Sequence, residues 1–381
     1  MEKPQPGVEP FEKELTELRG KIDGIDTQIV SLINERLGVS AAVGDLKRQY
    51  DSKVLDRSRE SLIMDRICRL NQGPVDDTVL QYIFSVIMAA SRELQKPQTI
   101  AYLGPEATHS HLAALSHFRH SGHFVPYRNI AEIFAEVERG GCQNGVVPVE
   151  NSIEGAVTHT LDMLFESDVK IIAEHYQAIS HDLLSLWGNL DEVEVVYSHP
   201  QPFAQCRSWL QRNLPEVVLE ECSSTAQAAQ KAATNPKSAA IASSKAAQVY
   251  GLQVVESKIE DSSRNETRFL VLGREDQAPT GNDKTSVMFV TSHIPGALFT
   301  TLEPVADTGL NMVKLESRPT KRENWSYFFI MDIEGHKDDA RMKRVLDTMK
   351  GLCLYLKVLG SYPKGEHAGY RNADESSPEV L

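Results

Sequence analysis

The first ninety-five residues carry charged and amide side chains at helical spacings. Residues 56, 59 and 60 lie three and four apart, and residues 91 and 95 lie four apart, so each group shares one helix face. The full set is Arg19, Arg36, Lys47, Asp56, Arg59, Glu60, Ser91 and Gln95. For any one member, a solvated salt-bridge face is the favoured interpretation. Several cations among leucine and isoleucine together predict a pocket for a substrate with more than one carboxylate.

The middle of the chain contains four segments that combine turn formers with hydroxyl, amide and charged side chains. They are Gly104-Pro105 with Thr108 and Ser110, Pro148-Val149-Glu150-Asn151-Ser152 with Gly155, Ser198-His199-Pro200-Gln201 with Gln205-Cys206, and Asn265-Glu266-Thr267-Arg268-Phe269. Each segment alone is compatible with ordinary turn or helix-cap chemistry.

Two segments near the C-terminus combine a glycine with charged residues. They are Gly296-Ala297-Leu298 and Glu316-Ser317-Arg318-Pro319. A glycine before a helix leaves backbone N–H groups free for an amino-acid carboxylate. The alternative is an ordinary helix start and strand end.

A histidine-rich stretch raises the question of a metal site. His109, His111, His117, His120 and His123 lie close in sequence, and imidazoles are common zinc ligands. No carboxylate or cysteine completes a familiar ligand spacing, so surface histidines on a helix are the favoured interpretation. We expect no metal and no cofactor.

The elements that position the first set are helices. Apolar residues alternate steps of three and four along 11–50, which predicts a coiled-coil-like helix roughly 60 Å long. These residues are Leu15, Leu18, Ile22, Ile25, Ile29 and Leu32. Such a stripe is too long to be covered inside one small domain, so a helical partner chain is expected. Shorter helices are predicted over 55–70 and 80–94, which makes 11–95 an all-helical unit.

From residue 99 the pattern changes to short apolar strand runs that alternate with helical stretches, which predicts an α/β domain over 99–274 with a parallel-type sheet. Predicted strands cover 99–103, 145–147, 169–172, 193–197, 239–241 and 269–272. A linker over 274–284 precedes a third domain, 285–363, in split βαβ order. We expect the tail, 364–381, to be disordered.

Composition excludes several classes of protein. A net charge of −13 argues against a nucleic-acid binder, and no apolar run is long enough to span a membrane. The first ten residues have no secretory pattern, so a cytoplasmic location is expected. Five cysteines without a CxxC pair indicate reduced thiols.

The helical set resembles the helical class of chorismate mutase, as it occurs at the start of the bifunctional chorismate mutase/prephenate dehydratases of phenylalanine biosynthesis. Every position of that family's mutase signature is filled, from Arg19 to Gln95. The resemblance implies that Arg19 reaches the active site of the opposite chain of a homodimer. It also implies that Arg36 and Arg59 hold carboxylates, and that Lys47 and Gln95 donate hydrogen bonds to the breaking ether oxygen of chorismate.

The four middle segments resemble the prephenate dehydratase motifs of the same family, and the resemblance implies a two-lobed fold like that of periplasmic binding proteins. Its lobes would be about 99–176 plus 262–274, and 177–261. Two residues depart from the pattern: Ala107 stands where glycine is usual, and His109 where Tyr or Phe is usual. These departures bear on how closely the substrate fits, and not on which reaction is catalysed.

Thr267 is the predicted catalytic residue of the dehydratase. Its hydroxyl would give a proton to the departing 4-hydroxyl of prephenate while the ring aromatises and carbon dioxide leaves. Arg268 is predicted to hold a substrate carboxylate. The other predicted substrate contacts are Glu150, Asn151, Ser152, Ser198 and Gln205.

The last domain resembles the ferredoxin-like ACT regulatory domain of the family. The resemblance implies L-phenylalanine as an allosteric effector, bound by Gly296, Ala297, Leu298, Glu316, Ser317 and Arg318.

Two rival functions remain open at this point. One is a monofunctional dehydratase whose helices only dimerise, against which the intact polar set argues. The other is a catalytically silent amino-acid sensor, since two-lobed folds also bind ligands without chemistry. The Thr267 motif argues against the sensor.

Overall fold

The computed structural model describes residues 8–49, 57–95, 98–119, 122–190, 192–262, 264–319 and 327–367. The chain divides into two compact units, which are described separately. One contains residues 1–98 with 118–122, and the other contains the remainder of 99–381. Of the predicted tail, 364–381, the structure describes 364–367, and 368–381 lie outside the described residues.

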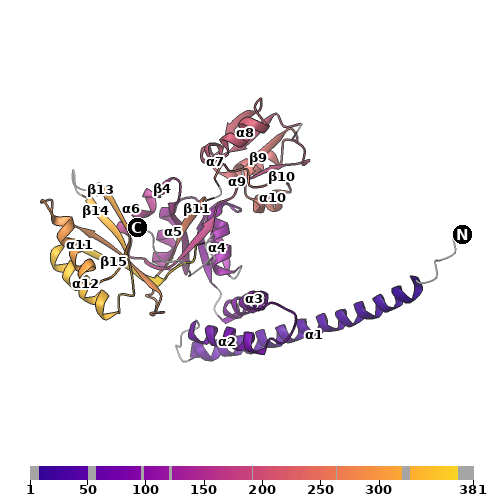
Figure 1. Ribbon diagram of the computed structural model, residues 1–381, viewed down its shortest axis with the longest axis horizontal. Coiled ribbons are helices and arrows are strands. Elements are labelled where there is room, and N and C mark those ends of the chain that lie inside the picture. Colours follow the sequence, from indigo (N-terminus) through magenta and orange to yellow (C-terminus); the bar gives the residue numbers. More distant parts are fainter. Residues whose placement is uncertain are drawn as a thin grey trace, which may run out of the picture. The chain divides into compact units, whose positions relative to one another are not determined.

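The first unit is helical, as predicted. Its helices are α1 (Val8–Gln49), α2 (Arg57–Leu70) and α3 (Asp77–Gln95). The C-terminal part of α1 packs against α3, while its N-terminal part extends beyond both shorter helices (Figure 1). The predicted stripe of α1 is exposed in this single chain: Leu18, Ile22 and Ile25 are 50%, 56% and 55% exposed.

The first sheet of the second unit has the order β2-β1-β3-β11-β5, with β4 paired to β3. Its strands are β1 (Thr99–Leu103), β2 (His123–Tyr127), β3 (Asn144–Asn151), β4 (Gly155–Ala156), β5 (Lys170–Ala178) and β11 (Glu266–Gly273). Its helices are α4 (His109–Phe118), α5 (Ile130–Arg139) and α6 (Thr158–Glu166).

The prediction of a parallel sheet is wrong for this part. The strands β2, β1 and β3 are parallel, but β11 runs antiparallel to both β3 and β5. The chain leaves this sheet at the C-terminal end of β5 and returns at the same end, because Glu266 at the start of β11 pairs with Ala178 at the end of β5. The strand β11 therefore runs in the opposite direction to β5.

The second sheet has the order β10-β6-β9-β7-β8. Its strands are β6 (Asp182–Ser185), β7 (Val195–Ser198), β8 (Val218–Glu221), β9 (Ser238–Ala242) and β10 (Gln253–Glu256). Its helices are α7 (Pro200–Gln205), α8 (Arg207–Asn213), α9 (Thr225–Ala232) and α10 (Ser244–Tyr250). The two sheets therefore form two lobes, joined by crossover segments 179–181 and 257–265.

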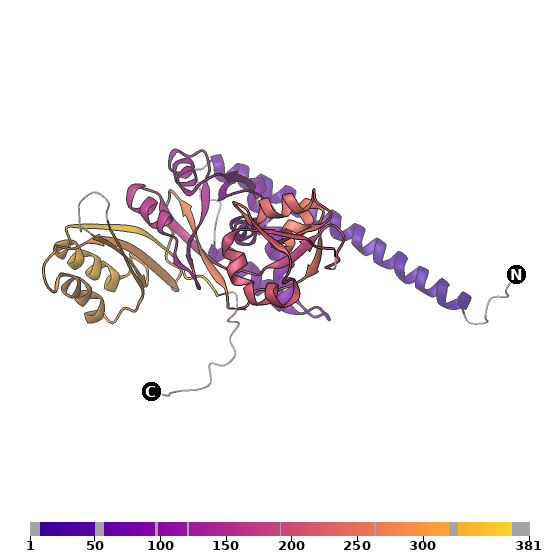
Figure 2. The same ribbon diagram turned by 90° about the horizontal axis from the view of Figure 1, so that it is seen from above.

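The third sheet has the order β13-β14-β12-β15, and its chain order, βαββαβ, is the predicted one. The elements are β12 (Asp283–Val290), α11 (Ala297–Asp307), β13 (Met312–Pro319), β14 (Tyr327–Glu334), α12 (Ala340–Leu352) and β15 (Tyr355–Pro363). Both helices lie side by side on one face of the sheet (Figures 1 and 2). Their core includes Val287, Phe289, Val305 and Met342.

The other face of the third sheet packs on the first lobe. Because side chains alternate along a strand, Met288 points away from α11 and α12. Together with Phe328 and Tyr362 it joins the core of the first lobe, which includes Phe134 and Leu161. The first lobe and the third sheet thus share one hydrophobic core.

Candidate functional sites

Thr267 is part of a hydrogen-bonded network where the two lobes join. It pairs with Asn151 across β11 and β3, and Asn151 Nδ2 donates to Thr267 Oγ1 over 2.9 Å. The same amide donates to Asn265 Oδ1 over 2.8 Å, and Asn265 Nδ2 donates to Gln205 Oε1 over 3.0 Å. His181 Nε2 lies 2.7 Å from that oxygen. We call Asn151, His181, Gln205, Asn265 and Thr267 the interlobe network.

Both crossover segments hold this network in place. Ile179 N donates to Asn265 O over 2.8 Å, and Ile259 N donates to His181 O over 2.9 Å. The carboxylate of Glu260 accepts from His181 N over 2.9 Å. The network therefore contains residues of both lobes, held where the chain passes between them.

Asn151 leaves the Thr267 hydroxyl free to donate. Because the Asn151 amide group supplies the hydrogen to Thr267 Oγ1, the threonine's own hydrogen can point to a substrate. Thr267 is 8% exposed, so such a bond would form largely out of water.

His181 and His109 are the residues of this region that sequence reasoning missed. His109 was singled out as a departure from the family pattern and as a member of the histidine stretch, but not as a dehydratase residue, and His181 lies in no quoted motif. Their rings are 5.6 Å apart in an edge-to-face arrangement. Burial, and then the neighbouring His181, lowers the pKa of His109 to about 3, and burial also lowers the pKa of His181.

The interpretation of the histidine stretch as surface residues is wrong at two positions. His111 is 6% exposed and stacks on Tyr102, and both ring nitrogens of His109 are out of contact with solvent. The start of α4 places His111 against Tyr102 and Phe124 of the first lobe, and His109 against His181 of the crossover segment. His120 lies outside the described residues.

Ala107 adopts a backbone conformation that favours glycine. Its φ of 66° is in the left-handed region, where a Cβ atom crowds the following carbonyl. This explains why glycine is usual at this position in the family that the sequence resembles. Ala107 N donates to His111 Nδ1 over 3.1 Å.

Three other predicted dehydratase residues lie apart from Thr267. Ser198 donates to Ile241 O over 3.0 Å within the second lobe, and Ser152 donates to Arg264 O over 3.0 Å. Glu150 pairs with Arg268 in register, on the opposite face of the strands from Thr267, and lies 2.6 Å from Lys314 of β13. The structure therefore groups Thr267 with Asn151 and Gln205 only.

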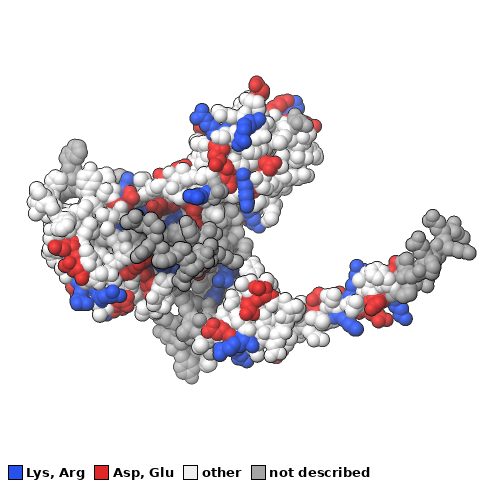
Figure 3. All heavy atoms as spheres, in the orientation of Figure 1, with Lys and Arg blue, Asp and Glu red and all other residues white. Residues whose placement is uncertain are grey.

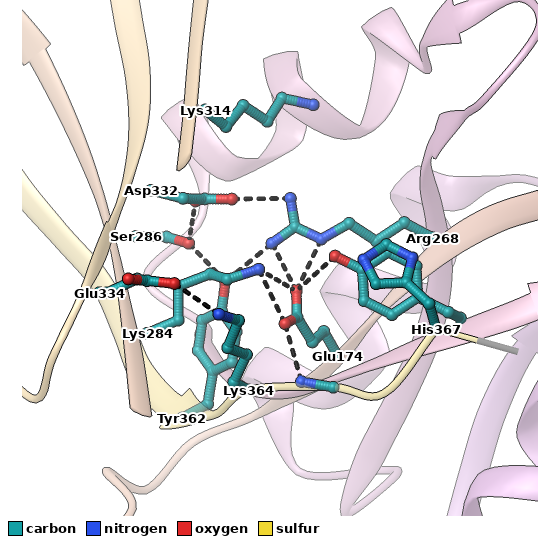
Figure 4. Close-up of polar contacts among 12 residues, drawn as sticks. Glu174, Arg268, Lys284, Ser286, Lys314, Asp332, Glu334, Tyr362, Lys364 and His367 are labelled. Carbon is teal, nitrogen blue, oxygen red and sulfur yellow. Dashed lines mark hydrogen bonds and ion pairs between the residues drawn. The ribbon is translucent and has the colours of Figure 1, made fainter. Parts of the chain in front are cut away.

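Arg268 also points away from Thr267, towards the third sheet. Its guanidinium lies between Glu174 and Asp332, 2.7 Å from each (Figure 4). Lys284 lies 2.8 Å from Glu174, and Arg268 Nη2 donates to the Tyr362 hydroxyl over 3.0 Å. With its charge neutralised in this way, Arg268 is placed to join the first lobe to the third sheet, and this position does not support a substrate-carboxylate role.

The Arg268 cluster is buried and balanced in charge. The side chains of Glu174, Arg268, Lys284 and Asp332 are 0%, 7%, 5% and 3% exposed. Burial alone would raise the pKa of Asp332, but Arg268, Ser286 and Lys284 together lower it. The cluster borders a cavity of about 450 Å³ that also contacts Glu150, Lys314 and His367.

Among the described residues of the helical unit, a predicted pair of side chains lies in contact. Arg36 Nη1 of α1 donates to Ser91 Oγ of α3 over 2.8 Å, and Ser91 is 7% exposed. Lys47 is half-buried near the end of α1, and Arg19 lies exposed on the same helix, roughly 26 Å from Arg36 along its axis. Asp56 lies outside the described residues, as do the side chains of Arg59, Glu60 and Gln95.

The two predicted effector segments lie at the same end of the third sheet. Val290 of β12 and Arg318 of β13 both pair with Phe328, and Gly296 precedes α11 a few residues after Val290. Glu316 and Ser317 precede Arg318 on β13, and Ala297 and Leu298 open α11. Arg318 Nη2 lies 3.1 Å from Asp162 of α6, so this strand also contacts the first lobe.

Comparison with known proteins matches a family model to each of the three parts of the chain. Residues 18–96 match the family model for chorismate mutase type II, 100–277 the model for prephenate dehydratase, and 285–349 the model for the ACT domain. A bifunctional chorismate mutase/prephenate dehydratase of Aquifex aeolicus is 44% identical over 356 residues, which is 92% of this chain and 98% of that protein.

Two solved structures share the fold of the second unit. A prephenate dehydratase from Arthrobacter aurescens, solved in complex with L-Phe, is 32% identical with a TM-score of 0.65, covering 70% of this chain and 90% of that one. A protein described as a novel type of quorum quenching acylase is 28% identical with a TM-score of 0.65, covering 72% of this chain and 100% of that one. A shared fold alone transfers no activity.

The fold and the sites thus define a multidomain enzyme with a helical chorismate mutase domain, a two-lobed prephenate dehydratase domain and an ACT domain. The chain belongs to the family of bifunctional chorismate mutase/prephenate dehydratases.

Proposed function

We propose that the two activities use separate sets of residues in one chain. The helical unit rearranges chorismate to prephenate, and the interlobe network converts prephenate to phenylpyruvate with loss of water and carbon dioxide. The Asn151–Thr267 hydrogen bond carries the dehydratase assignment, because it leaves the threonine hydroxyl as a donor at the junction of two lobes.

The mutase reaction is a pericyclic rearrangement, so it needs no nucleophile. Arg36, held by Ser91, binds a carboxylate of chorismate, and Arg59 binds another. Lys47 and Gln95 donate to the ether oxygen as it gains electron density, which is electrostatic preorganisation. Asp56, Glu60 and Ser91 orient the cations.

L-Phenylalanine is the proposed effector. The start of α11 offers backbone N–H groups for its carboxylate, and the end of β13 lies at the same end of the sheet. Arg318 contacts Asp162 of the first lobe, so occupation of this end can alter how the ACT domain packs on the dehydratase.

The enzyme is proposed to act as a homodimer or larger oligomer in the cytoplasm. The exposed stripe of α1 supports an oligomer, because an uncovered helical seam of this length favours a second helix. Among the described residues no helix is long and apolar enough to cross a membrane. On the face shown in Figure 3, basic and acidic side chains are interspersed along α1, and the net charge is −13. We therefore expect small-molecule substrates and no nucleic-acid partner.

Two single substitutions test the separation of sites. Arg36→Ala should abolish chorismate consumption and leave prephenate dehydration intact, and Thr267→Ala should do the reverse. Both activities are measured on each variant, with Thr267→Ser as the matched control that keeps the hydroxyl. Loss of both activities in a folded single variant would contradict separate sites.

A further inference from the structure

Three buried imidazole nitrogens next to the interlobe network have no hydrogen-bond partner among the described residues. They are Nδ1 and Nε2 of His109 and Nδ1 of His181. His181 is 2% exposed. A buried polar atom without a partner costs about 1–3 kcal/mol, and native proteins rarely retain one without a purpose. A molecule bound at this place would supply the missing partner.

The hydrogen-bonding role of His181 Nδ1 follows from its neighbours. Gln205 Oε1 lies 2.7 Å from His181 Nε2 and accepts from Asn265 as well. A carbonyl oxygen only accepts, so Nε2 carries the proton. Burial favours the neutral ring, in which Nδ1 then presents a lone pair. The absent partner of Nδ1 is consequently a hydrogen-bond donor.

The other nitrogen of this ring, Nε2, links His181 to Thr267. His181 connects through Gln205, Asn265 and Asn151 to Thr267 by consecutive hydrogen bonds of 2.7 to 3.0 Å. The His109 and His181 rings meet edge to face, and the neutral His109 ring has one N–H to donate.

Prephenate has a single group that can satisfy an acceptor. Its carboxylates are ionised at neutral pH and its keto oxygen only accepts, so the 4-hydroxyl is its one donor. This hydroxyl is also the group that leaves in the dehydratase reaction.

We propose that His181 Nδ1 accepts a hydrogen bond from the 4-hydroxyl of prephenate, with the His109 ring on the same side of that group. The inference rests on the proposed assignment of the interlobe network as the dehydratase site. His181 would hold the hydroxyl hydrogen and so direct an oxygen lone pair to Thr267. As the C4–O bond breaks, the oxygen takes the Thr267 proton and leaves as water. The bond between the ring and its carboxylate breaks, its electron pair enters the ring, and carbon dioxide departs. Thr267 then regains a proton from solvent.

Two substitutions at His181 separate its two nitrogens. In His181→Gln the amide can still donate to Gln205, but no atom replaces Nδ1. In His181→Asn the amide oxygen lies near the position of Nδ1, and the bond to Gln205 is lost. We expect kcat/KM for prephenate to fall about tenfold to hundredfold in His181→Gln, and less in His181→Asn.

A second readout distinguishes contact with the hydroxyl from a structural role. Phenylpyruvate lacks the 4-hydroxyl, so its inhibition constant against prephenate should be unchanged in His181→Gln. His109→Phe keeps an aromatic ring and removes both nitrogens. It should lower kcat/KM for prephenate and leave the inhibition constant of phenylpyruvate unchanged.

The proposal is overturned by wild-type kcat/KM in His181→Gln, by an equal or larger loss in His181→Asn, or by a phenylpyruvate constant that rises in step with the loss of kcat/KM. Failure of the dehydratase assignment itself would show differently, as retained dehydratase activity in Thr267→Ala.

Discussion

Neighbouring residues of β11 serve different parts of the molecule. Thr267 joins the interlobe network, whereas Arg268, one residue on, lies between Glu174 and Asp332 against the ACT domain. Side chains of a strand alternate between faces, so a motif read along the sequence combines residues that act in separate places. The same alternation separates Asn151 from Glu150 on β3.

Removal of Glu174 should destabilise the second unit. Glu174→Ala leaves Arg268 and Lys284 buried with one carboxylate, Asp332, between them, and breaking a buried ion pair on one side costs about 3–5 kcal/mol. The matched control is Glu334→Ala, which removes a partly exposed pair with Lys364 and should cost about 0–1 kcal/mol. Urea unfolding measures the unfolding free energy of both variants. Equal losses of this free energy would contradict a dominant role for the buried cluster.

His109 should make stability fall in acid. Its pKa is lowered to about 3 in the folded chain by burial and by His181, against about 6.5 when unfolded. The unfolded state therefore binds the extra proton between these values, so the contribution is complete above pH 6.5 and is lost as the pH falls towards 3.

His109→Phe removes this proton and should reduce the pH dependence. Between pH 6 and 4 the wild type should lose up to about 1.4 kcal/mol of unfolding free energy per pH unit relative to the variant. Urea unfolding at several pH values measures this difference, and His293→Gln, at an exposed histidine, is the control. Parallel curves for wild type and His109→Phe would show that His109 is protonated in the folded state.

At the scale of elements, a close backbone contact adds to the shared core and the ion pairs that hold the ACT domain to the dehydratase. β15 crosses β5 so closely that a Cβ atom on Gly360 would overlap the backbone of Ile171. Backbone atoms cannot move aside as the end of a flexible side chain can. Glycine is therefore required here by proximity.

Gly360→Ala should weaken this packing by about 1–3 kcal/mol, the usual cost of overpacking. Gly351→Ala is the matched control, since it lies in α12 with open space around it and should be neutral or stabilising. Limited proteolysis between the domains and thermal unfolding report the change. Unchanged proteolysis and thermal unfolding in Gly360→Ala would mean that β15 lies further from β5.

At the scale of the whole molecule, the mutase site that we propose is incomplete in one chain. Arg36 and Ser91 meet, whereas Arg19 lies far along the exposed part of α1. The uncovered stripe with Ile22 and Ile25 offers a second chain a seam on which to pack.

Mixed oligomers test whether Arg19 acts across chains. Arg19→Ala and Arg36→Ala should each lack mutase activity, and mixing the two after reversible dissociation should restore part of it, because a mixed dimer contains one site with both arginines. Two inactive parents that stay inactive in a verified mixed oligomer would place Arg19 and Arg36 in the same chain's site. Chorismate consumption measures the mutase activity, and sedimentation measures the oligomeric state of the mixture.

Local patterns in the sequence were sufficient for many elements. The bounds of β1 agree with the predicted 99–103, and the seam of α1 and the βαββαβ order were also predicted. These signals are local, since they depend on periodicity and turn residues within one segment. The strands β2, β6, β8 and β10 were missed because they lack a distinct alternation of apolar and polar residues.

The sequence by itself determined which residue types are available for chemistry, and the family resemblance built on them identified both enzyme domains. Only the tertiary structure decided which of these residues act together. The antiparallel return of β11 pairs Thr267 with Asn151 and directs Arg268 to the ACT domain. The crossover segments bring His181 to Gln205 and Asn265, from positions far apart in the chain. Such pairings depend on strand register and on long-range hydrogen bonds, which no local pattern records.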